Sequence, residues 1–309
     1  TTFTNLLASF EAPLEVVYPT LFDQNTELET VETTPSSTQI KAPHRVATPL
    51  VYIPVFPGTN CEYDTAKAFE AAGAVTKIVP FRTMDISASI KDMVANIKQA
   101  NILMFAGGFS AADEPDGSAK FIVNILLNEA VKSAIEAFIA RGGLILGICN
   151  GFQALVKSGL LPYGSFDSLS DQSPTLFYND ANQHVAKMVE TKIINTNSPW
   201  LTGVAVGDIH AIPVSHGEGK FVVSTQELEA LIKNGQIISQ YVDFQGQATM
   251  NSAYNPNGSV AAIEGIISKN GQILGKMGHS ERYEAGLFKN IPGNKDQKLF
   301  ESAVAYFRG

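Results

Sequence analysis

A cysteine between two glycines is the residue of this chain best suited to covalent chemistry. Cys149 lies in residues 147–151 (GICNG), directly after the apolar run at residues 144–146 (LIL). A small-x-nucleophile-x-small pattern between a buried strand and a helix is typical of a nucleophile elbow, in which the glycines permit a sharp turn. The N–H groups at the start of the helix then favour a reactive thiolate. A buried, inert cysteine is the alternative interpretation.

A cysteine nucleophile needs a base, and the base needs a group that orients it. Of the five histidines, His279 is the one followed two residues later by a carboxylate, Glu281, after a clear apolar strand. Because residues i and i+2 of an extended segment point to the same side, Glu281 can reach the imidazole. It would fix the tautomer of His279 and stabilise the imidazolium. Alone, a His-x-Glu sequence reads better as an incidental surface loop, but together with Cys149 it predicts a catalytic triad.

A second strand end offers groups that could stabilise an oxyanion. Residues 107–110 (GGFS) follow an apolar run, and paired glycines allow a close approach of the backbone. We expect the backbone N–H groups of Gly108 and Asn150 to form an oxyanion hole. A plain turn at the end of the strand is the alternative.

Other reactive side chains carry weaker signals. Cys61 follows the first strand, and because no histidine partner is evident near it, we expect it to serve local packing or the substrate side of the site. The loop at residues 216–219 (HGEG) is either a ligand-binding turn or a plain one. His44 and His184 lie in polar segments, and we expect no catalytic role for them.

The scaffold that positions these residues follows from strand–helix alternation. Strands are expected at residues 50–55, 75–79, 102–105 and 144–148, with helices from Glu62, over 86–97 and over 121–139. This alternation predicts an α/β fold with a mostly parallel central sheet flanked by helices, flavodoxin-like, with catalytic groups at the C-terminal strand ends. The second half adds short strands of antiparallel type, expected at residues 187–194, 204–214, 221–224, 237–242, 260–267 and 272–277. A closing helix is expected at residues 295–306.

Composition excludes several classes of protein. The 309 residues carry a net charge of −8, so there is no basic stripe for nucleic acid, and no apolar run is long enough for a membrane. Two cysteines make neither a disulfide framework nor a zinc spacing, which favours a reducing cytoplasm. Residues 26–38 are acidic and rich in threonine and serine. We therefore expect residues 1–48 to be the tail of a preceding domain plus a linker, and residues 49–309 to be the catalytic domain.

With these residues assembled, the chain resembles the class I (triad) glutamine amidotransferases, and more specifically the glutaminase domain of phosphoribosylformylglycinamidine synthase. The resemblance covers roughly residues 50–309. It is carried by separated segments: residues 56–66 (FPGTNCEYDTA), 107–110 (GGFS), 147–153 (GICNGFQ), 197–201 (NSPWL), 216–219 (HGEG), 255–259 (NPNGS) and 279–282 (HSER).

The resemblance implies a glutaminase with a Cys149 thioester. It implies hydrolysis of L-glutamine, with ammonia passed to a synthetase region of the same longer polypeptide or of a separate subunit. ATP and Mg²⁺ are expected to act in that region, and this chain is expected to hold no cofactor and no metal. The residues that match substrate-binding positions of the family are Phe109, Ser110, Gln153, His216 and Glu218.

The chain departs from the family pattern at one loop, and two other functions stay open. The family's commoner form flanks the triad histidine with prolines, whereas this chain has Gly278 and Ser280, which puts the rigidity of the loop in question. The alternatives are another cysteine-elbow hydrolase of the same superfamily and a non-catalytic glutamine-sensing domain. Gln153 and the complete triad argue against both.

Overall fold

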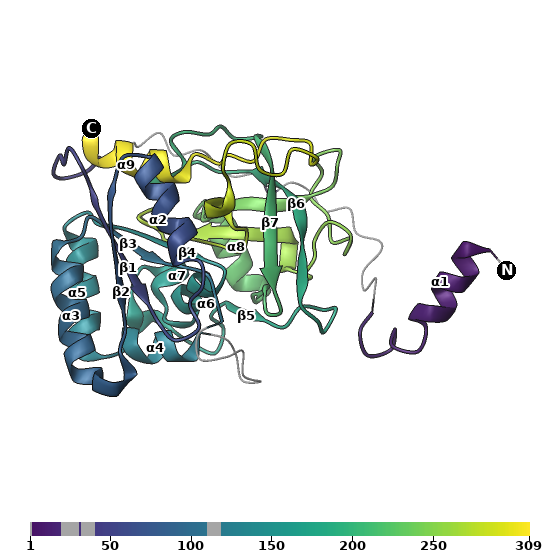
Figure 1. The fold of residues 1–309 in the computed structure, drawn as a ribbon, viewed down its shortest axis with the longest axis horizontal. Helices are drawn as coiled ribbons and strands as arrows, with labels where there is room; N and C mark the ends of the chain where they lie inside the picture. The colour runs from purple at the N-terminus through teal and green to yellow at the C-terminus, as the bar shows by residue number, and fades with distance from the viewer. Residues whose placement is uncertain (1, 20–30, 32–40, 110–118) are drawn as a thin grey trace.

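The computed structural model describes residues 2–19, 31, 41–109 and 119–309 (Figure 1). Apart from Val31, the linker expected at residues 26–38 lies outside the described residues. The first helix, α1 (Phe3–Glu11), has no buried residue and stands apart from the main body in Figure 1. No helix among the described residues combines the length and the hydrophobicity that crossing a bilayer requires.

A nine-stranded sheet forms the centre of the described chain, in the order β2-β1-β3-β4-β11-β10-β9-β6-β7. The first five of these strands are parallel, and the remaining neighbours pair antiparallel. The α/β fold with a parallel sheet and additional antiparallel strands is therefore confirmed. The parallel strands are β1 (Leu50–Val55), β2 (Val75–Pro80), β3 (Ile102–Phe105), β4 (Leu144–Ile148) and β11 (Ile273–Lys276). The others are β6 (Val185–Ile193), β7 (Ile209–His216), β9 (Ile237–Val242) and β10 (Ile263–Ile267), while β5 (Thr175–Phe177) and β8 (Lys220–Val222) form a separate pair.

Helices cover both faces of the parallel half, as the alternation predicts. In Figure 1, α3 (Ile86–Gln99) and α5 (Glu129–Ala140) lie side by side on one face, and α2 (Glu62–Ala71) lies on the other. The C-terminal helix α9 (Leu299–Arg308) packs against α2. The remaining helices are α4 (Lys120–Leu126), α6 (Asn150–Lys157), α7 (Leu160–Tyr163) and α8 (Thr225–Lys233).

Several expected boundaries are wrong, and local capping explains most of them. The single helix expected at 121–139 is two helices, because Asn128 Oδ1 accepts a hydrogen bond from Ala130 N and starts α5 anew. The strand expected at 221–224 ends at Val222, since Ser224 caps α8. The strand expected at 204–214 begins only at Ile209, after a turn in which Asp208 accepts from the backbone of Ala205. The closing helix begins at Leu299 rather than 295.

The sheet brings four loops to one edge. In the order of the sheet, β1, β3, β4 and β11 are neighbours and run in the same direction. Their C-terminal ends are followed, respectively, by Cys61, Gly107, Cys149 and His279. Residues up to 218 positions apart in the sequence therefore meet in one place, as expected for the C-terminal edge of a parallel sheet.

Candidate active site

Cys149 occupies a strained turn between β4 and α6. Its φ is +53° and its ψ is −108°, a backbone conformation that non-glycine residues rarely adopt. The flanking glycines are required by close backbone packing: a Cβ on Gly147 would lie 2.7 Å from the carbonyl oxygen of Gly151, and a Cβ on Gly151 would lie 2.0 Å from that of Phe105. The sequence thus folds here into the geometry of a nucleophile elbow.

The structure brings the three predicted catalytic residues together. His279 Nδ1 lies 2.6 Å from Glu281 Oε1, and Cys149 lies close to the same ring, whose Nε2 has no hydrogen-bond partner among the described residues. All three side chains are buried. Glu281 reaches the ring from a 3₁₀ turn, Ser280–Arg282, and not from the extended segment that the sequence argument assumed.

The site favours a protonated His279 beside an ionised Glu281. Burial acts to lower the pKa of His279, but the Glu281 charge, the nearby thiols of Cys149 and Cys61 and the hydrogen bond to Glu281 raise it well above its usual value. For Glu281, burial acts to raise the pKa, yet the facing imidazolium and its hydrogen bond leave it lowered. An imidazolium in this position can carry the proton of a thiol and return it to a leaving group.

The predicted oxyanion loop lies beside the elbow. A Cβ on Gly107 would lie 3.5 Å from Cys149 Cβ and 2.8 Å from His279 Cε1, so this glycine lines the space between the two side chains. Asn150 is the first residue of α6, where backbone N–H groups lie outside the intrahelical hydrogen bonds. The two expected donors, Gly108 and Asn150, therefore belong to segments on either side of the sulfur.

Two residues of the loop after β1 fix the peptide that carries the Gly108 N–H. The carbonyl of Gly107 accepts hydrogen bonds from Asn60 N (3.1 Å) and Cys61 N (3.2 Å). Because a trans peptide directs its N–H opposite to its C=O, these bonds also set the direction of the Gly108 N–H. Phe109 N donates to the Gly58 carbonyl at 2.8 Å and secures the other side of the loop.

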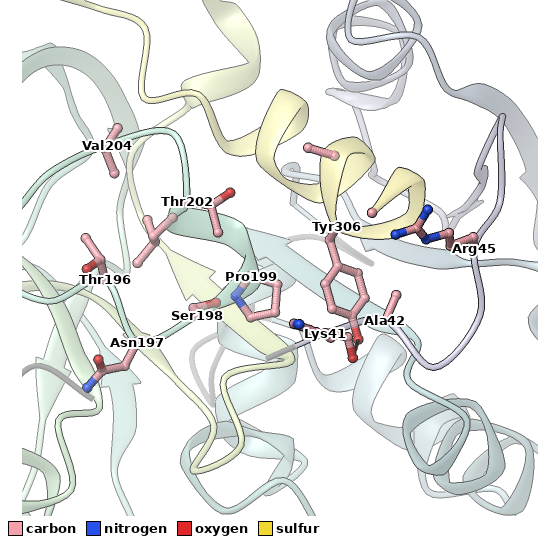
Figure 2. A pocket seen from close by; sticks show the side chains of 13 residues that line it. Lys41, Ala42, Arg45, Thr196, Asn197, Ser198, Pro199, Thr202, Val204 and Tyr306 are labelled. Atoms are coloured by element: carbon pink, nitrogen blue, oxygen red, sulfur yellow. Dashed lines mark hydrogen bonds between the residues drawn. The ribbon is translucent and has the colours of Figure 1, made fainter. Parts of the chain in front are cut away.

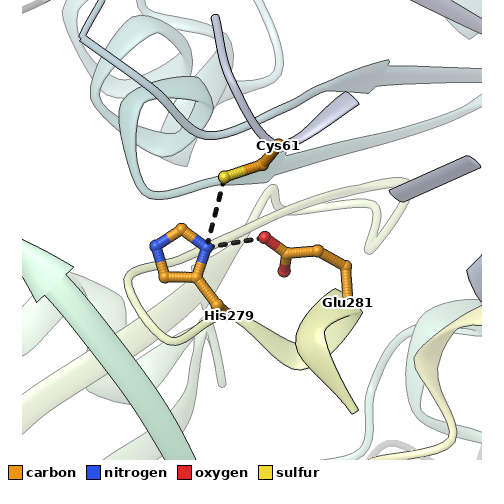
Figure 3. Close-up of side chains that lie close together, drawn as sticks. All are labelled: Cys61, His279 and Glu281. Atoms are coloured by element: carbon orange, nitrogen blue, oxygen red, sulfur yellow. Dashed lines mark hydrogen bonds and ion pairs between the residues drawn. The ribbon is translucent and has the colours of Figure 1, made fainter. Parts of the chain in front are cut away.

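Cys61 has a histidine partner, so the expectation that it has none is wrong. Its Sγ lies 3.9 Å from His279 Nδ1 (Figure 3). Arg282 Nη2 also donates to the sulfur at 3.2 Å. The partner is remote in sequence and becomes a neighbour only through the sheet. The donor atoms of Cys61, His279 and Glu281 lie within 4.8 Å of one another, a set that zinc can bind. Each atom already has a protein hydrogen-bond partner, and the absence of a metal site stays a prediction.

Gln153 of α6 and the loop at residues 216–219 contact each other and form one buried wall. Gln153 Nε2 donates to the carbonyl of Glu218 at 2.5 Å, and Gln153 Oε1 accepts from Asn150 Nδ2 at 2.9 Å. His216 is 1 % exposed, and its Nδ1 donates to Asn179 Oδ1 at 3.0 Å. Burial, then the charge of His279, lowers the pKa of His216 to about 3. His216 is therefore a neutral ring close to the triad, and the loop is more than a plain surface turn.

Phe109 lies against His184. Their ring centroids are 5.8 Å apart, and His184 Nε2 pairs with Ser215 Oγ at 3.0 Å. The carbonyl of Ser215 in turn accepts from Cys149 Sγ at 3.6 Å. Ser110 lies outside the described residues, so its predicted contact with substrate stays a prediction.

Sequence reasoning missed a buried ion pair behind the histidine. Lys276 Nζ lies 3.1 Å from Glu264 Oε1, with the two side chains 1 % and 0 % exposed. The available signal was a lone charge in each of two apolar strands, residues 260–267 and 272–277. A charge in a buried strand needs a partner, and each of these strands supplies one for the other.

A cavity of about 560 Å³ lies away from these residues (Figure 2). It is lined by Lys41, Arg45 and Tyr306 together with most of residues 196–202, and by none of the predicted site residues. The segment at 197–201, one of those that carry the family resemblance, therefore contributes to this cavity and not to the surroundings of Cys149.

Known proteins are similar to this chain along most of its length. Residues 48–307 match the family described as CobB/CobQ-like glutamine amidotransferase domain. The phosphoribosylformylglycinamidine synthase subunit PurQ of Sulfurimonas denitrificans is 35 % identical over 242 residues, which are 78 % of this chain and 93 % of that protein. The PurQ subunit of Methanococcus maripaludis is 36 % identical over 272 residues, 81 % of this chain and 95 % of that protein.

A solved structure shares the fold. The structure of PurLQS from Thermotoga maritima contains a chain that matches with a TM-score of 0.60 and 24 % identity, covering 84 % of this chain and 99 % of that one. At this identity the similarity supports the architecture of the sheet and its helices.

Proposed function

Since the chain belongs to the family of CobB/CobQ-like glutamine amidotransferase domains, and within it is related to PurQ subunits, we propose that Cys149, His279 and Glu281 hydrolyse L-glutamine. The chain is the glutaminase half of phosphoribosylformylglycinamidine synthase, which acts in purine biosynthesis. The observation that carries this assignment is the proximity of an elbow thiol to a histidine whose Nδ1 is held by a buried carboxylate and whose Nε2 has no hydrogen-bond partner among the described residues.

Acylation begins when Cys149 Sγ attacks the side-chain amide carbon of glutamine. The amide oxygen takes up the negative charge and is stabilised by the N–H groups of Gly108 and Asn150. His279, which holds the proton from the sulfur, gives it to the amide nitrogen. The C–N bond breaks, ammonia leaves, and a glutamyl thioester remains on Cys149.

Deacylation reverses these proton transfers. A water molecule attacks the thioester carbon, and His279 accepts a proton from it. The C–S bond breaks, glutamate leaves, and the sulfur and ring regain their starting states. Throughout, Glu281 fixes the tautomer and balances the charge of the ring.

Substrate recognition falls to groups around the sulfur. Gln153, His216 and Glu218 form the buried wall at α6, and we assign Phe109 and Ser110, which follow Gly108 in the sequence, to the binding of the same substrate. His216 is neutral and donates through Nδ1, so its Nε2 offers a lone pair to a donor of the substrate.

Ammonia is then used elsewhere. The PurQ relatives are named as subunits, and the Thermotoga maritima complex carries PurL and PurS as well, which supports a separate synthetase partner. ATP and Mg²⁺ would act in that synthetase region, where formylglycinamide ribonucleotide becomes the amidine. We place this reaction in the cytoplasm. We assign residues 1–48 to the tail of a preceding domain and a linker.

A glutamine-analogue electrophile tests the proposal. If the chain is a glutaminase, we expect the electrophile to alkylate Cys149. We also expect the chain, in complex with the synthetase region, to release ammonia from glutamine and to leave peptide substrates intact. Cleavage of peptides instead would favour a cysteine-elbow hydrolase. Reversible glutamine binding with neither alkylation nor turnover would favour a sensing domain.

A further inference from the structure

The loop that carries His279 is hydrogen-bonded to the buried ion pair of Lys276 and Glu264. The two residues come from neighbouring antiparallel strands, β11 and β10, and neither side chain is more than 1 % exposed. Removing two charges from water is costly unless the pair is well hydrogen-bonded, and such a pair is weak evidence for a role in stability alone. Its hydrogen bonds indicate what else it does.

Both members of the pair bond Gly278, the residue before His279, and Lys276 also bonds Ser280, the residue after it. Glu264 Oε1 accepts from Gly278 N at 2.8 Å, and Lys276 Nζ donates to the carbonyl of Gly278 at 2.8 Å. Lys276 Nζ also donates to Ser280 Oγ at 3.0 Å. The pair therefore holds both backbone polar groups of the residue before the histidine and the side chain of the residue after it.

Further contacts connect this arrangement to the rest of the sheet. Ser239 Oγ donates to Glu264 Oε2 at 2.5 Å, and Ser280 Oγ donates to Gln297 Oε1 at 2.5 Å. A Cβ on Gly278 would lie 2.2 Å from Ile212 Cδ1, so only glycine fits between the pair and β7. A proline at this position would also remove the N–H that Glu264 binds.

We infer that Lys276 and Glu264 are positioning residues for the catalytic base. They restrict the backbone of Gly278 before His279 and the side chain of Ser280 after it, so that the ring faces Cys149 while Nδ1 meets Glu281. In this chain the ion pair supplies the rigidity that the residues flanking the histidine, a glycine and a serine, do not supply by themselves. The inference rests on the proposed function, because it assigns a task within that reaction.

A double substitution separates positioning from stability. Lys276→Met together with Glu264→Leu replaces the pair by apolar side chains of similar volume, an exchange that often leaves stability unchanged or higher. In this protein the exchange also removes hydrogen-bond partners from the backbone of Gly278 and from two serine hydroxyls, so we expect a moderately lower thermal midpoint, to be compared with that of the control variant below. We expect kcat, measured in complex with the synthetase region, to fall about 10- to 100-fold with KM nearly unchanged, since small misplacements of a catalytic group have effects of this size. Alkylation of Cys149 should slow in parallel.

A conservative variant adds a rescue. Lys276→Met with Glu264→Gln keeps an acceptor for Gly278 N and should recover part of the lost kcat. The single substitutions leave one buried charge unpaired and are expected to fold poorly, so the double variants carry the test.

Gln236→Leu is the matched control. Gln236 is 2 % exposed and donates to the carbonyls of Pro162 and Ile267, at the end of β10 remote from His279. The substitution Gln236→Leu should lower the stability of the protein and leave kcat unchanged. A Lys276→Met/Glu264→Leu protein with unaltered kcat overturns the inference, as does a loss of kcat that follows stability in the same proportion as in Gln236→Leu. Failure of the unaltered protein to be alkylated would count against the proposed function instead.

Discussion

His279 Nδ1 and Glu281 Oε1 are 2.6 Å apart, and water has almost no access to either side chain. A carboxylate so close to a buried ring keeps the second proton on that ring as the pH rises past the usual histidine value. The imidazolium is the form that can protonate departing ammonia. The pair therefore determines how far into alkaline solution the enzyme can work.

Glu281→Gln should move the alkaline limit of activity to lower pH. The folded-state pKa of His279 is raised, so its protonated form persists until the pH exceeds that raised pKa. Removing the carboxylate charge lowers this pKa and shortens the active range. At neutral pH, kcat should fall about 10²- to 10⁴-fold, as for other orienting acids. The check is a pH profile of kcat in the complex, and an unmoved alkaline limb would contradict the assigned role of Glu281.

Cys149→Ala should abolish glutamine-dependent synthesis while synthesis from added ammonia survives. The thiol is required only to release ammonia from the amide, and free ammonia bypasses that step. The measurement compares the two nitrogen sources in the full enzyme. Cys61→Ala is the matched control, because it removes the neighbouring thiol and should leave alkylation at Cys149. If both nitrogen sources fail with Cys149→Ala, the sulfur is not confined to the glutaminase step.

Gly107→Ala should impair catalysis more than folding. The new Cβ would lie 2.8 Å from His279 Cε1 and 3.1 Å from Cys61 Sγ. The imidazole ring of His279 must therefore shift from its position near Cys149. We expect kcat to fall by about 10- to 100-fold. Gly217→Ala is the control, since a Cβ there meets nothing within 4 Å. Equal activities of the two alanine variants would show that the ring tolerates the contact.

The stability of the protein should decrease in mild acid through His216. Its folded-state pKa of about 3 lies below the unfolded value near 6.5, so the unfolded chain binds the extra proton. The stability present above pH 6.5 is therefore lost as the pH falls, by about 1.5 kcal/mol between pH 6.5 and pH 5. Denaturant unfolding at several pH values measures this slope. His216→Gln should flatten it, whereas a substitution of the exposed His44 should not.

The sequence was sufficient for the parts of the site that depend on local pattern. The turn at Cys149 requires small residues on both sides, and the spacing of His279 and Glu281 is short, so both could be recognised without coordinates. Four of the five parallel strands were equally clear, because each is a short apolar run between helical patterns, but the fifth, β11, was expected among the antiparallel strands. The positions that depend on single caps were missed, as at Asn128, where one side chain divides a helix.

Contacts between distant strands could not be found in this way. Cys61 and His279 are separated by 218 positions, and Lys276 and Glu264 belong to different strands. Which strands become neighbours depends on the order of the whole sheet, and nothing in either local segment records it. The charges in the two apolar strands were visible, yet only the register of β10 with β11 shows that they meet.

Strand β11 is the last strand of the sheet in sequence and lies between β4 and β10, where it joins the parallel and antiparallel halves. During synthesis on the ribosome, the thiol of Cys149 emerges about 130 residues before this strand and the histidine that follows it. A partly synthesised chain thus carries the nucleophile without its proton carrier, and the two halves of the sheet are not yet joined. The proposed catalytic residues can therefore come together only when the last strand of the sheet has been made.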